Sequence, residues 1–487
     1  MKQIASLWLT WSLLSGSAVA QGWGPVVQIS TAPNGRAQIT AEGITTDDSQ
    51  RIHIVWQDAR DGNREIYYRR SSDGGQSWGT ETRLTNDTGY SAWPAVATGP
   101  GGGVHMVWWD DRDTLYGSNI GEVFYKRSTD GGGSWLPDTR LTREFWGKGY
   151  PNVVVGLNNQ VDLLWEGQYY GQSQTNVLYY MRSSDGGATW GPDTALTRPP
   201  QYTLSQSFAS AKQGRLHLTW DGRSNGPFDS SRVFYCRSTD GGVTWDTVRQ
   251  LNTSLFQAHS PSVSADSQGF VYCAWMDKRN RRGEIYFRRS PDGGISWDSE
   301  VTLATSPDND YVWPSVTAGS RGEVGVGYYW LSSDQRIIGV AYRHSADRGM
   351  TWGPEELVSD TIAHWVGSVS TAMDSFGRAH VAWSDSTASL GYWAVYYRRR
   401  NAGVGVETNP PSRLTPYPSR LTVSPNPFTS FTTLPGHTSE RFALYDVSGR
   451  LVGNYKGDQV GEGLSAGVYF LRPEGKDAKP LRIIKLR

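Results

Sequence analysis

The sequence predicts an all-β protein: a seven-bladed β-propeller closed by its N-terminal strand and followed by a small C-terminal β-sandwich. Three observations lead to this prediction. The 487 residues include 56 glycines and 24 prolines, which suit many short strands joined by turns better than long helices. One eight-residue pattern recurs six times at nearly constant spacing. Strand-like apolar runs recur in register with that pattern, and such self-similarity is typical of stacked repeats.

The repeated pattern is Ser-x-Asp-x-Gly-x-(Ser/Thr)-Trp, first seen from Ser71 to Trp78 and last from Ser345 to Trp352. Its Gly suits a turn with positive φ, its Asp can accept backbone N–H groups, and its Trp covers an apolar strand edge. A catalytic role would require six equivalent active sites in one chain. We therefore predict a structural role for the six aspartates, which lie 52 to 57 residues apart: Asp73, Asp130, Asp185, Asp240, Asp292 and Asp347.

Each repeat also contains three strand-like runs before the pattern and one after it. In the second repeat these runs are residues 94–97, 104–108 and 123–127, and the fourth ends at residue 142. Short, evenly spaced strands separated by glycine-rich turns are typical of four-stranded propeller blades. Because one twisted sheet cannot cover both of its apolar faces, we expect the blades to stack face to face.

The seventh repeat lacks the pattern and the fourth strand. It begins near Ser368 and stops at Asn401. The segment from Trp23 to Ser30 resembles the post-pattern strand from Trp190 to Thr197, with an aliphatic residue six positions after the Trp in both. We therefore predict that the N-terminal segment supplies the outermost strand of the last blade, which leaves no free sheet edge and assigns residues 21–401 to the propeller.

Composition excludes several function classes. The chain has 47 Lys+Arg and 47 Asp+Glu, a balance that argues against a nucleic-acid partner. No metal-ligand spacing, phosphate-binding loop or Ser-His-Asp motif is present, so we predict neither a metal nor a cofactor. We expect a monomer.

The first 20 residues predict a secretory signal peptide. A short basic opening at residues 1–3 precedes an apolar stretch from Ile4 to Leu14 and a small-residue cleavage site at residues 18–20. Eleven helical residues span about 16 Å, short of a hydrocarbon core of about 30 Å, so no retained membrane span is expected. In an oxidising compartment Cys236 and Cys273 can form a disulfide, but we favour two small apolar residues within strands.

The eight-residue pattern resembles the Asp-box, or BNR, repeat, and over residues 21–401 the ring resembles the sialidase superfamily. The resemblance implies that the boxes lie between the third and fourth strands of each blade, on the face opposite the active site. The loops between strands two and three, and those between blades, would then form the functional face.

A second motif recurs at the end of strand two, as in Trp108-Trp109-Asp110-Asp111-Arg112 and Trp275-Met276-Asp277-Lys278-Arg279. Its Arg can clamp a carboxylated sugar, or its Asp and Arg can tie a blade corner together with a Glu of strand three. We favour the tie, because catalytic residues have unlike roles whereas these residues recur as copies. Asp110, Arg112 and Arg279 therefore remain weak catalytic candidates. The third blade departs from the motif and adds two further candidates, Glu166 and Tyr169.

Unlike residues occupy the loops that precede the innermost strands. Flat aromatic side chains suit the apolar faces of sugar rings, although they can also pack a loop against the next blade. The predicted ligand-binding residues are Trp93, Trp146, Tyr150, His259, Tyr311, Trp313 and Trp365.

Sialidase activity would require specific residues at this face. The resemblance implies an arginine triad for the substrate carboxylate, a Tyr nucleophile activated by a Glu, and an Asp as acid/base. The family's first arginine lies in an Arg-Ile-Pro motif, whereas the equivalent stretch here, residues 35–39, is Gly-Arg-Ala-Gln-Ile. The resemblance also implies six blades, whereas seven are counted. A sialidase should bring an arginine cluster and a Tyr–Glu pair into one pocket, and a structural spacer should have a funnel without clustered aromatic residues.

Beyond the propeller, residues 402–419 predict a Pro-rich linker and residues 420–487 a separate β unit. Its ordered signatures at residues 424–428, 444–450, 467–471 and 481–487 resemble the C-terminal sorting domain of type IX secretion substrates. That resemblance implies the type IX machinery as a partner and export through the periplasm, ending in release or attachment to the outer surface.

Three functions are consistent with the sequence. The first is an exported or surface propeller that recognises a glycan or glycoconjugate, which we favour slightly. The second is an exo-acting, sialidase-like glycoside hydrolase. The third is a non-catalytic structural surface protein.

Overall fold

The computed structural model describes residues 22–31, 35–113, 121–143, 148–169, 172–197, 201–211, 214–224, 231–332, 338–359, 366–386, 392–401, 441–446, 450–456, 458–460, 464–473 and 481–485. The expected signal peptide, residues 1–20, and linker, residues 402–419, lie outside these ranges. The chain divides into two compact units, Met1–Val404 and Gly405–Arg487. Each unit is described by itself below.

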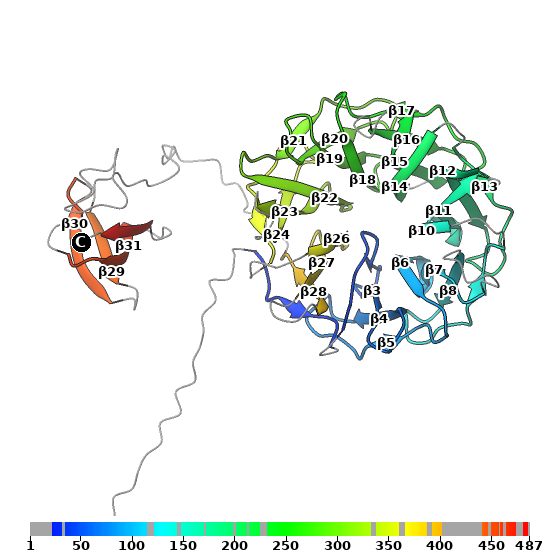
Figure 1. The fold of residues 1–487 in the computed structure, drawn as a ribbon, viewed down its shortest axis with the longest axis horizontal. Coiled ribbons are helices and arrows are strands. Elements are labelled where there is room, and N and C mark those ends of the chain that lie inside the picture. Colours follow the sequence, from blue (N-terminus) through cyan, green and yellow to red (C-terminus); the bar gives the residue numbers. More distant parts are fainter. Residues whose placement is uncertain are drawn as a thin grey trace, which may run out of the picture. The chain divides into compact units, whose positions relative to one another are not determined.

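The all-β prediction is confirmed. The described residues contain strands and two short 3-10 helices, η1 (Pro100–Gly102) and η2 (Leu157–Asn159), and no α-helix. None of their helical segments has the length and apolar character needed to cross a membrane. The first unit has seven four-stranded antiparallel sheets, which follow one another around a ring (Figure 1).

Six of these blades are formed by consecutive strands, written from the innermost outwards. The first three comprise β2 (Ile44–Thr46), β3 (Ile52–Asp58), β4 (Glu65–Ser71), β5 (Thr82–Arg83); β6 (Ser91–Thr98), β7 (Val104–Asp110), β8 (Glu122–Ser128), β9 (Thr139–Arg140); and β10 (Lys148–Val155), β11 (Val161–Tyr169), β12 (Gln172–Ser183), β13 (Thr194–Ala195). The next three comprise β14 (Gln201–Ala211), β15 (Arg215–Ser224), β16 (Arg232–Ser238), β17 (Arg249–Gln250); β18 (Ala258–Ala265), β19 (Val271–Asp277), β20 (Glu284–Ser290), β21 (Val301–Ala304); and β22 (Asn309–Ala318), β23 (Val324–Ser332), β24 (Ile338–Ser345), β25 (Glu356–Leu357).

The seventh blade joins the two ends of the ring. It consists of β26 (Val366–Met373), β27 (Ala379–Ser386), β28 (Trp393–Arg399) and, outermost, the N-terminal strand β1 (Val27–Gln28). Val27 pairs with Tyr397. Trp23, just before β1, is buried at 1% exposure and packs edge-on against Tyr342 of the sixth blade at 5.4 Å between ring centroids. Its indole N–H donates to Glu356 Oε2 at 2.7 Å, so the N-terminal segment also ties the seventh blade to the sixth.

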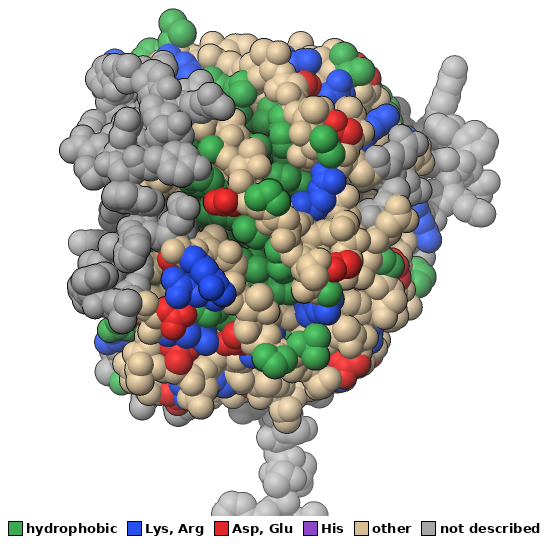
Figure 2. All heavy atoms as spheres, turned by 90° about the vertical axis from the view of Figure 1, so that its right-hand side faces the viewer, with side chains coloured by type: hydrophobic (Ala, Val, Ile, Leu, Met, Phe, Trp, Pro, Cys, Tyr) green, Lys and Arg blue, Asp and Glu red, His purple; other side chains and the backbone are tan. Residues whose placement is uncertain are grey.

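The core lies between neighbouring blades. Each second strand is sandwiched by the adjacent sheets, so residues on both of its faces are buried, as in β7 and β19. The largest side chains of this core are tryptophans at equivalent second-strand positions in six blades: Trp56, Trp108, Trp165, Trp220, Trp275 and Trp383. On the side of the ring seen in Figure 2, basic and acidic side chains are interspersed among uncharged and apolar ones.

Each Asp box closes the turn that follows a third strand. Asp130 Oδ1 accepts the backbone N–H of Gly133 and of Ser134, both at 2.8 Å, and Oδ2 accepts the Ser134 hydroxyl at 2.7 Å. Gly131 and Gly132 have φ of 72° and 77°, values that favour glycine. These hydrogen bonds to the ionised form hold the pKa of Asp130 far below its ordinary value.

Both cysteines are buried and free, so the alternative of a disulfide is wrong. Cys236 lies in β16 and Cys273 in β19, on different blades. Burial raises the pKa of both thiols.

The second unit contains one four-stranded sheet in the order β30-β29-β31-β32. Its strands are β29 (Arg441–Asp446), β30 (Leu451–Lys456), β31 (Gly467–Pro473) and β32 (Leu481–Lys485). Phe442, Leu444, Val460 and Leu471 form its fully buried core. The described residues of this unit contain one layer of the predicted sandwich.

Candidate functional site

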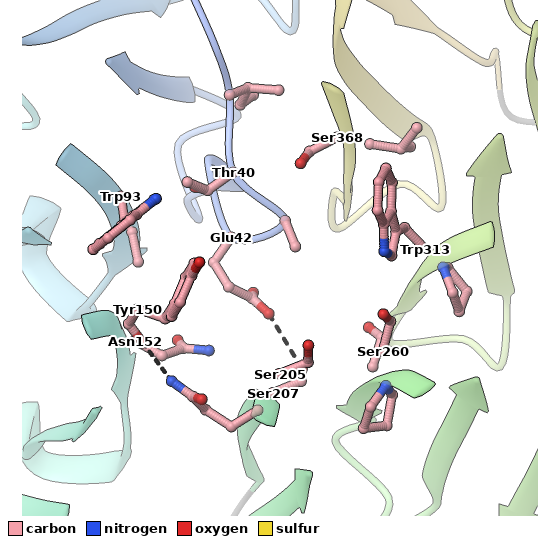
Figure 3. A pocket seen from close by; sticks show the side chains of 18 of the residues that line it. Thr40, Glu42, Trp93, Tyr150, Asn152, Ser205, Ser207, Ser260, Trp313 and Ser368 are labelled. Atoms are coloured by element: carbon pink, nitrogen blue, oxygen red, sulfur yellow. Dashed lines mark hydrogen bonds between the residues drawn. The ribbon is translucent and has the colours of Figure 1, made fainter. Parts of the chain in front are cut away.

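A cavity of about 660 Å³ opens where the innermost strands begin. Residues of all seven blades line it: the segment 38–42 ahead of β2, and the first residues of β6, β10, β14, β18, β22 and β26. Figure 3 shows their side chains converging on this space. We call it the axial cavity.

The axial cavity lies at the end of the blades opposite the Asp boxes. In the second blade, Ser91 at the start of β6 pairs with Asp110 at the end of β7, which in turn pairs with Glu122 at the start of β8. The box follows the other end of β8, beginning at Ser128. Because neighbouring strands are antiparallel, the starts of innermost strands and the boxes lie at opposite ends of each sheet.

Bulges aim side chains of the innermost strands into the cavity. The pairing of strands one and two shifts register near the start of six innermost strands. In five of them a non-glycine residue of the cavity lining adopts a left-handed conformation, which costs about 1–3 kcal/mol per residue. These residues are Trp93 (φ 52°), Tyr150 (φ 47°), Ser205 (φ 43°), Ser260 (φ 52°) and Trp313 (φ 49°). Four of them precede a proline, which has no N–H to lose where the ladder is interrupted.

Aromatic rings stand on two sides of the cavity. Trp93 stacks on Tyr150 with ring centroids 4.5 Å apart, and Trp313 packs edge-on against Tyr329 at 4.8 Å. Figure 3 shows the Trp93–Tyr150 pair on one side and Trp313 on the other. Tyr150 is 54% exposed and Trp313 is 47% exposed, so both present open ring surface.

Glu42 lies between these aromatic walls (Figure 3). It belongs to the segment ahead of β2 in the first blade, and its Oε1 accepts a hydrogen bond from Ser207 Oγ of the fourth blade at 3.2 Å. Its side chain keeps partial exposure to the cavity. The surrounding protein nevertheless desolvates the carboxyl, which raises the pKa of Glu42 to about 7.

Two further acids lie at the ends of neighbouring second strands. Glu166 of β11 is 5% exposed, and burial together with the charge of Asp221 raises its pKa to about 8. Asp221 of β15 is 1% exposed and accepts a hydrogen bond from His259 Nδ1 at 2.8 Å. Burial also raises the pKa of Asp221. Within the described part of the chain, Glu166 Oε1 and Asp221 Oδ1 have no hydrogen-bond partner.

The structure brings four predicted ligand-binding residues together in the axial cavity, namely Trp93, Tyr150, His259 and Trp313. Tyr311 is instead buried, with its ring 5.7 Å from that of Tyr328. Two others, Trp146 and Trp365, lie outside the described residues.

Of the weak catalytic candidates, Glu166 lines the cavity. Tyr169 ends β11, and its side chain is not among those described.

The other three catalytic candidates are not among the residues that line the cavity, because their own blade corners hold them. Arg112 pairs with Asp110 at 2.5 Å and with Asp138 at 2.7 Å. Arg279 pairs with Asp277 at 2.7 Å and with Glu300 at 2.6 Å. These ion pairs turn both guanidinium groups toward their own blade corners, as the structural tie requires, and Arg112 also pairs with Asp87, in the segment between β5 and β6, at 2.9 Å.

No Lys or Arg is among the described residues that line the axial cavity. The Tyr–Glu pair expected of a sialidase has a counterpart in Tyr150 and Glu166, but the expected arginine cluster does not occur in this lining. Clustered aromatic rings also distinguish the cavity from the funnel expected of a spacer. In the described residues no group of three or more His, Cys, Asp or Glu is arranged to hold a metal ion.

Sequence reasoning missed Glu42, Ser205, Ser207, Ser260 and Asp221 as residues of the site. The X-Pro dipeptide at the start of an innermost strand is a signal that identifies Trp93, Tyr150, Ser260 and Trp313 together. Glu42 carries no such signal, because the segment from residue 38 to residue 43 contains no proline.

Fold and site together define a seven-bladed β-propeller with a cavity on its axis. Residues 50–326, more than half of the chain, match the family model of the BNR repeat-like domain, and the chain belongs to this family.

Curated relatives match at low identity. A xyloglucanase of Paenibacillus sp. is 24% identical over 333 residues, which cover 60% of this chain and 30% of that protein. A sialidase of Bacteroides fragilis is 20% identical over 300 residues, which cover 54% of each chain. The chain therefore spans about a third to a half of the length of these relatives. Among solved structures, a fungal alcohol oxidase in complex with copper has a TM-score of 0.50 at 11% identity, covering 96% of this chain and 100% of that one, which shows likeness of fold alone.

Proposed function

We propose that this protein recognises a glycan in the axial cavity, on the face opposite the Asp boxes. Its volume of about 660 Å³ lies within the range of roughly 300–1,000 Å³ typical of ligand pockets. Open aromatic rings face the cavity from two sides, with hydroxyl, amide and carboxyl groups between them. Sugar rings present apolar faces to aromatic side chains and hydroxyl groups to polar ones.

The observation that carries this proposal is the combination of exposure and strain at Tyr150 and Trp313. Both side chains keep about half of their surface open, and both adopt a left-handed backbone conformation. Either feature occurs alone elsewhere in the ring, as at Arg348 with φ 60° and at Phe256 with 59% exposure, but Tyr150 and Trp313 combine both in aromatic side chains that line one cavity. Strained, exposed aromatic residues that converge on one cavity support ligand binding over the structural-spacer function.

Removing one aromatic wall tests the proposal. Trp313→Ala should weaken glycan binding about 3- to 10-fold through lost ring contact, with little change in thermal stability. Phe376→Ala is the matched control, because Phe376 is 43% exposed in the turn between β26 and β27, at the end of its blade opposite the cavity. A glycan array followed by calorimetry on the mature chain gives the readout. Equal losses in both variants, or no binding to any glycan, would contradict the proposal.

Hydrolysis is a second candidate function, favoured by the acids of the cavity. A carboxyl whose pKa is raised to about 8, as at Glu166, stays protonated at neutral pH and is suited to act as a general acid. Two curated relatives are named as a xyloglucanase and a sialidase. Release of a fluorophore from glycosides by wild type, lost in Glu166→Gln, would support an exo-acting hydrolase. A chain that binds a glycan without cleaving it would leave recognition as the function.

We further propose that residues 1–20 and 420–487 direct export through the periplasm by the type IX machinery, with release or attachment at the outer surface. The sequence signatures of both segments support this. In a host with that machinery, we expect the mature N-terminus at Gln21 and loss of export when residues 420–487 are deleted. Export that continues after the deletion would contradict the sorting role.

A further inference from the structure

The axial cavity collects acidic side chains, and the one basic side chain in its described lining is His259, which pairs with Asp221 at 2.8 Å. Glu42, Glu166 and Asp221 come from three different blades and line it together. No Lys or Arg is part of its described lining. The arginines of the repeated motif also lie at this end of the blades, but acids of the blade corners bind them. Arg60, for example, pairs with Asp58 at 2.6 Å and with Glu81 of its own blade.

Glu42 is held rigidly at the centre of this arrangement. The backbone carbonyl of Glu42 accepts the N–H of Val96 from the second blade at 3.1 Å. The carbonyl of the preceding Ala41 accepts Ser370 Oγ from the seventh blade at 2.6 Å. The Glu42 side chain then reaches Ser207 of the fourth blade at 3.2 Å. The carboxyl is therefore preorganised by contacts to three blades other than its own.

Such a carboxyl discriminates between ligands by charge. It accepts hydrogen bonds from sugar hydroxyl groups without loss, whereas a carboxylate on the ligand would meet like charge in a partly desolvated space and find no Arg or Lys in the described lining. Burial raises the pKa of Glu42 to about 7, so much of the repulsion is present at neutral pH and all of it above pH 8.

We propose that the axial cavity selects glycans that carry no carboxylate, and that Glu42 is the residue that sets this selectivity. The inference rests on the proposed glycan recognition and deepens it. It assigns the protein uncharged sugars as its ligand class, whereas a sialidase-like cavity with an arginine cluster would bind acidic sugars.

The test compares pairs of oligosaccharides that differ by one terminal sialic acid or by one hydroxymethyl group oxidised to a carboxylate. Calorimetry on the mature chain at pH 8 should show the neutral member of each bound pair binding at least about 10-fold more tightly. Glu42→Gln keeps the shape of the side chain and removes its charge, so the ratio should fall to about 3-fold or less.

Asp48→Asn is the matched control. Asp48 is an exposed acid in the turn between β2 and β3, at the box end of the first blade, and this change should leave the ratio unaltered. An acidic member that binds wild type as tightly as its neutral partner would overturn the selectivity while leaving glycan recognition intact. A ratio that is unchanged in a folded Glu42→Gln variant would overturn the role of Glu42. Should no oligosaccharide bind at all, glycan recognition itself is wrong and the selectivity falls with it. If Glu42→Gln does not fold, the wild-type ratio alone decides whether carboxylates are rejected.

Discussion

Residues of the axial cavity differ from blade to blade, whereas the residues of the boxes and of the blade corners are copies. Asp130 and its five counterparts direct both carboxylate oxygens into their own turns, and Arg112 and Arg279 bind acids of their own blades. A side chain whose hydrogen-bonding groups are satisfied locally has none left for a ligand. The unpaired oxygens of Glu166 and Asp221 belong to the unlike residues at the cavity. The hydrogen bonding of single residues therefore distinguishes candidate functional residues at the cavity from the structural residues that recur from repeat to repeat.

Glu166 should make the stability of the propeller decrease as pH rises. Its carboxyl has an ordinary pKa near 4.5 in the unfolded chain and about 8 in the folded one, so the folded state binds more protons between these values. Stabilisation of the folded state is fully present below pH 4.5 and is lost as pH rises through about 8. Replacing Glu166 with Gln should reduce the loss in free energy of unfolding between pH 5 and pH 8 by roughly 2–4 kcal/mol. Denaturant titrations at both pH values measure the change, and parallel behaviour of variant and wild type would contradict the assignment.

At the scale of the element, two local devices shape each blade at its opposite ends. The box closes the turn after the third strand, and the bulge near the start of the innermost strand turns a side chain toward the axis. The box uses glycines at positive φ, and the bulge uses non-glycine residues at positive φ. Both devices therefore place residues where a regular strand ladder would not. Non-glycine residues at positive φ also occur at the box end, as at Gln50 in the turn between β2 and β3 and at Arg348 within the sixth box.

Two serine-to-glycine substitutions in β18 should have opposite effects. Ser260 has φ of 52°, so Ser260→Gly relieves strain and should leave the free energy of unfolding unchanged or raise it by up to about 1 kcal/mol. Ser264 pairs regularly with Tyr272, and Ser264→Gly should lower the free energy of unfolding by about 0.5–1 kcal/mol. Chemical denaturation of both variants gives the comparison. Destabilisation of equal size at both positions would show that the bulge is not strained.

Loss of a box should affect stability and not ligand binding. Asp292 accepts the Ser296 hydroxyl at Oδ2 and the N–H of Ser296 and of Ile295 at Oδ1, and these hydrogen bonds outweigh desolvation and lower its pKa to about 2. Its stabilisation is present above pH 4 and is lost as pH falls through 2. At pH 7, Asp292→Ala should lower the midpoint of thermal unfolding by about 2 °C or more, with the difference shrinking toward pH 2. Asp193→Ala, at an exposed acid outside the boxes, serves as the control. Weakened glycan binding in Asp292→Ala alone would argue against a purely structural box.

For the whole molecule, ring closure decides both stability and site. The N-terminal segment completes the seventh blade through Val27 and buries Trp23 against the sixth. Glu42 follows this segment closely in the chain, so closure also holds the acid opposite Ser207. Joining chain ends more than 350 residues apart removes the free edges that an open ring would expose.

Trp23→Ala should destabilise the propeller much more than Trp313→Ala. Trp23 is 1% exposed whereas Trp313 is 47% exposed, and removing a buried Trp side chain costs about 3–5 kcal/mol. Thermal and chemical unfolding of the mature chain give the two values side by side. Similar stabilities for the two variants would mean that the N-terminal segment does not hold the ring closed.

The residues of the candidate site were predictable only in part. Trp93, Tyr150, His259 and Trp313 were predictable because the repeat defines locally where an innermost strand starts, although the structure places them among the first residues of these strands and not in the loops before them. The corner motif allowed two interpretations, since an Arg at a strand end can turn toward the axis or back toward its own blade. In the structure the arginines turn back toward acids of their own blades. These acids lie near the arginines because strand pairing brings them together.

The sequence by itself determined the strands, the boxes, the repeat length and the closing role of residues 23–30. Each of these follows from local periodicity or from the similarity between repeats. Only the tertiary structure decided that Glu42, Glu166 and Asp221 share one cavity in which the described lining has no Lys or Arg. Glu166 and Asp221 directly follow the equivalent tryptophans Trp165 and Trp220, whereas Glu42 lies ahead of an innermost strand, so the repeat links two of these acids and not the third. Their meeting exists only once the ring has closed, and so does the burial among the blades that raises the pKa values of Glu42 and Glu166.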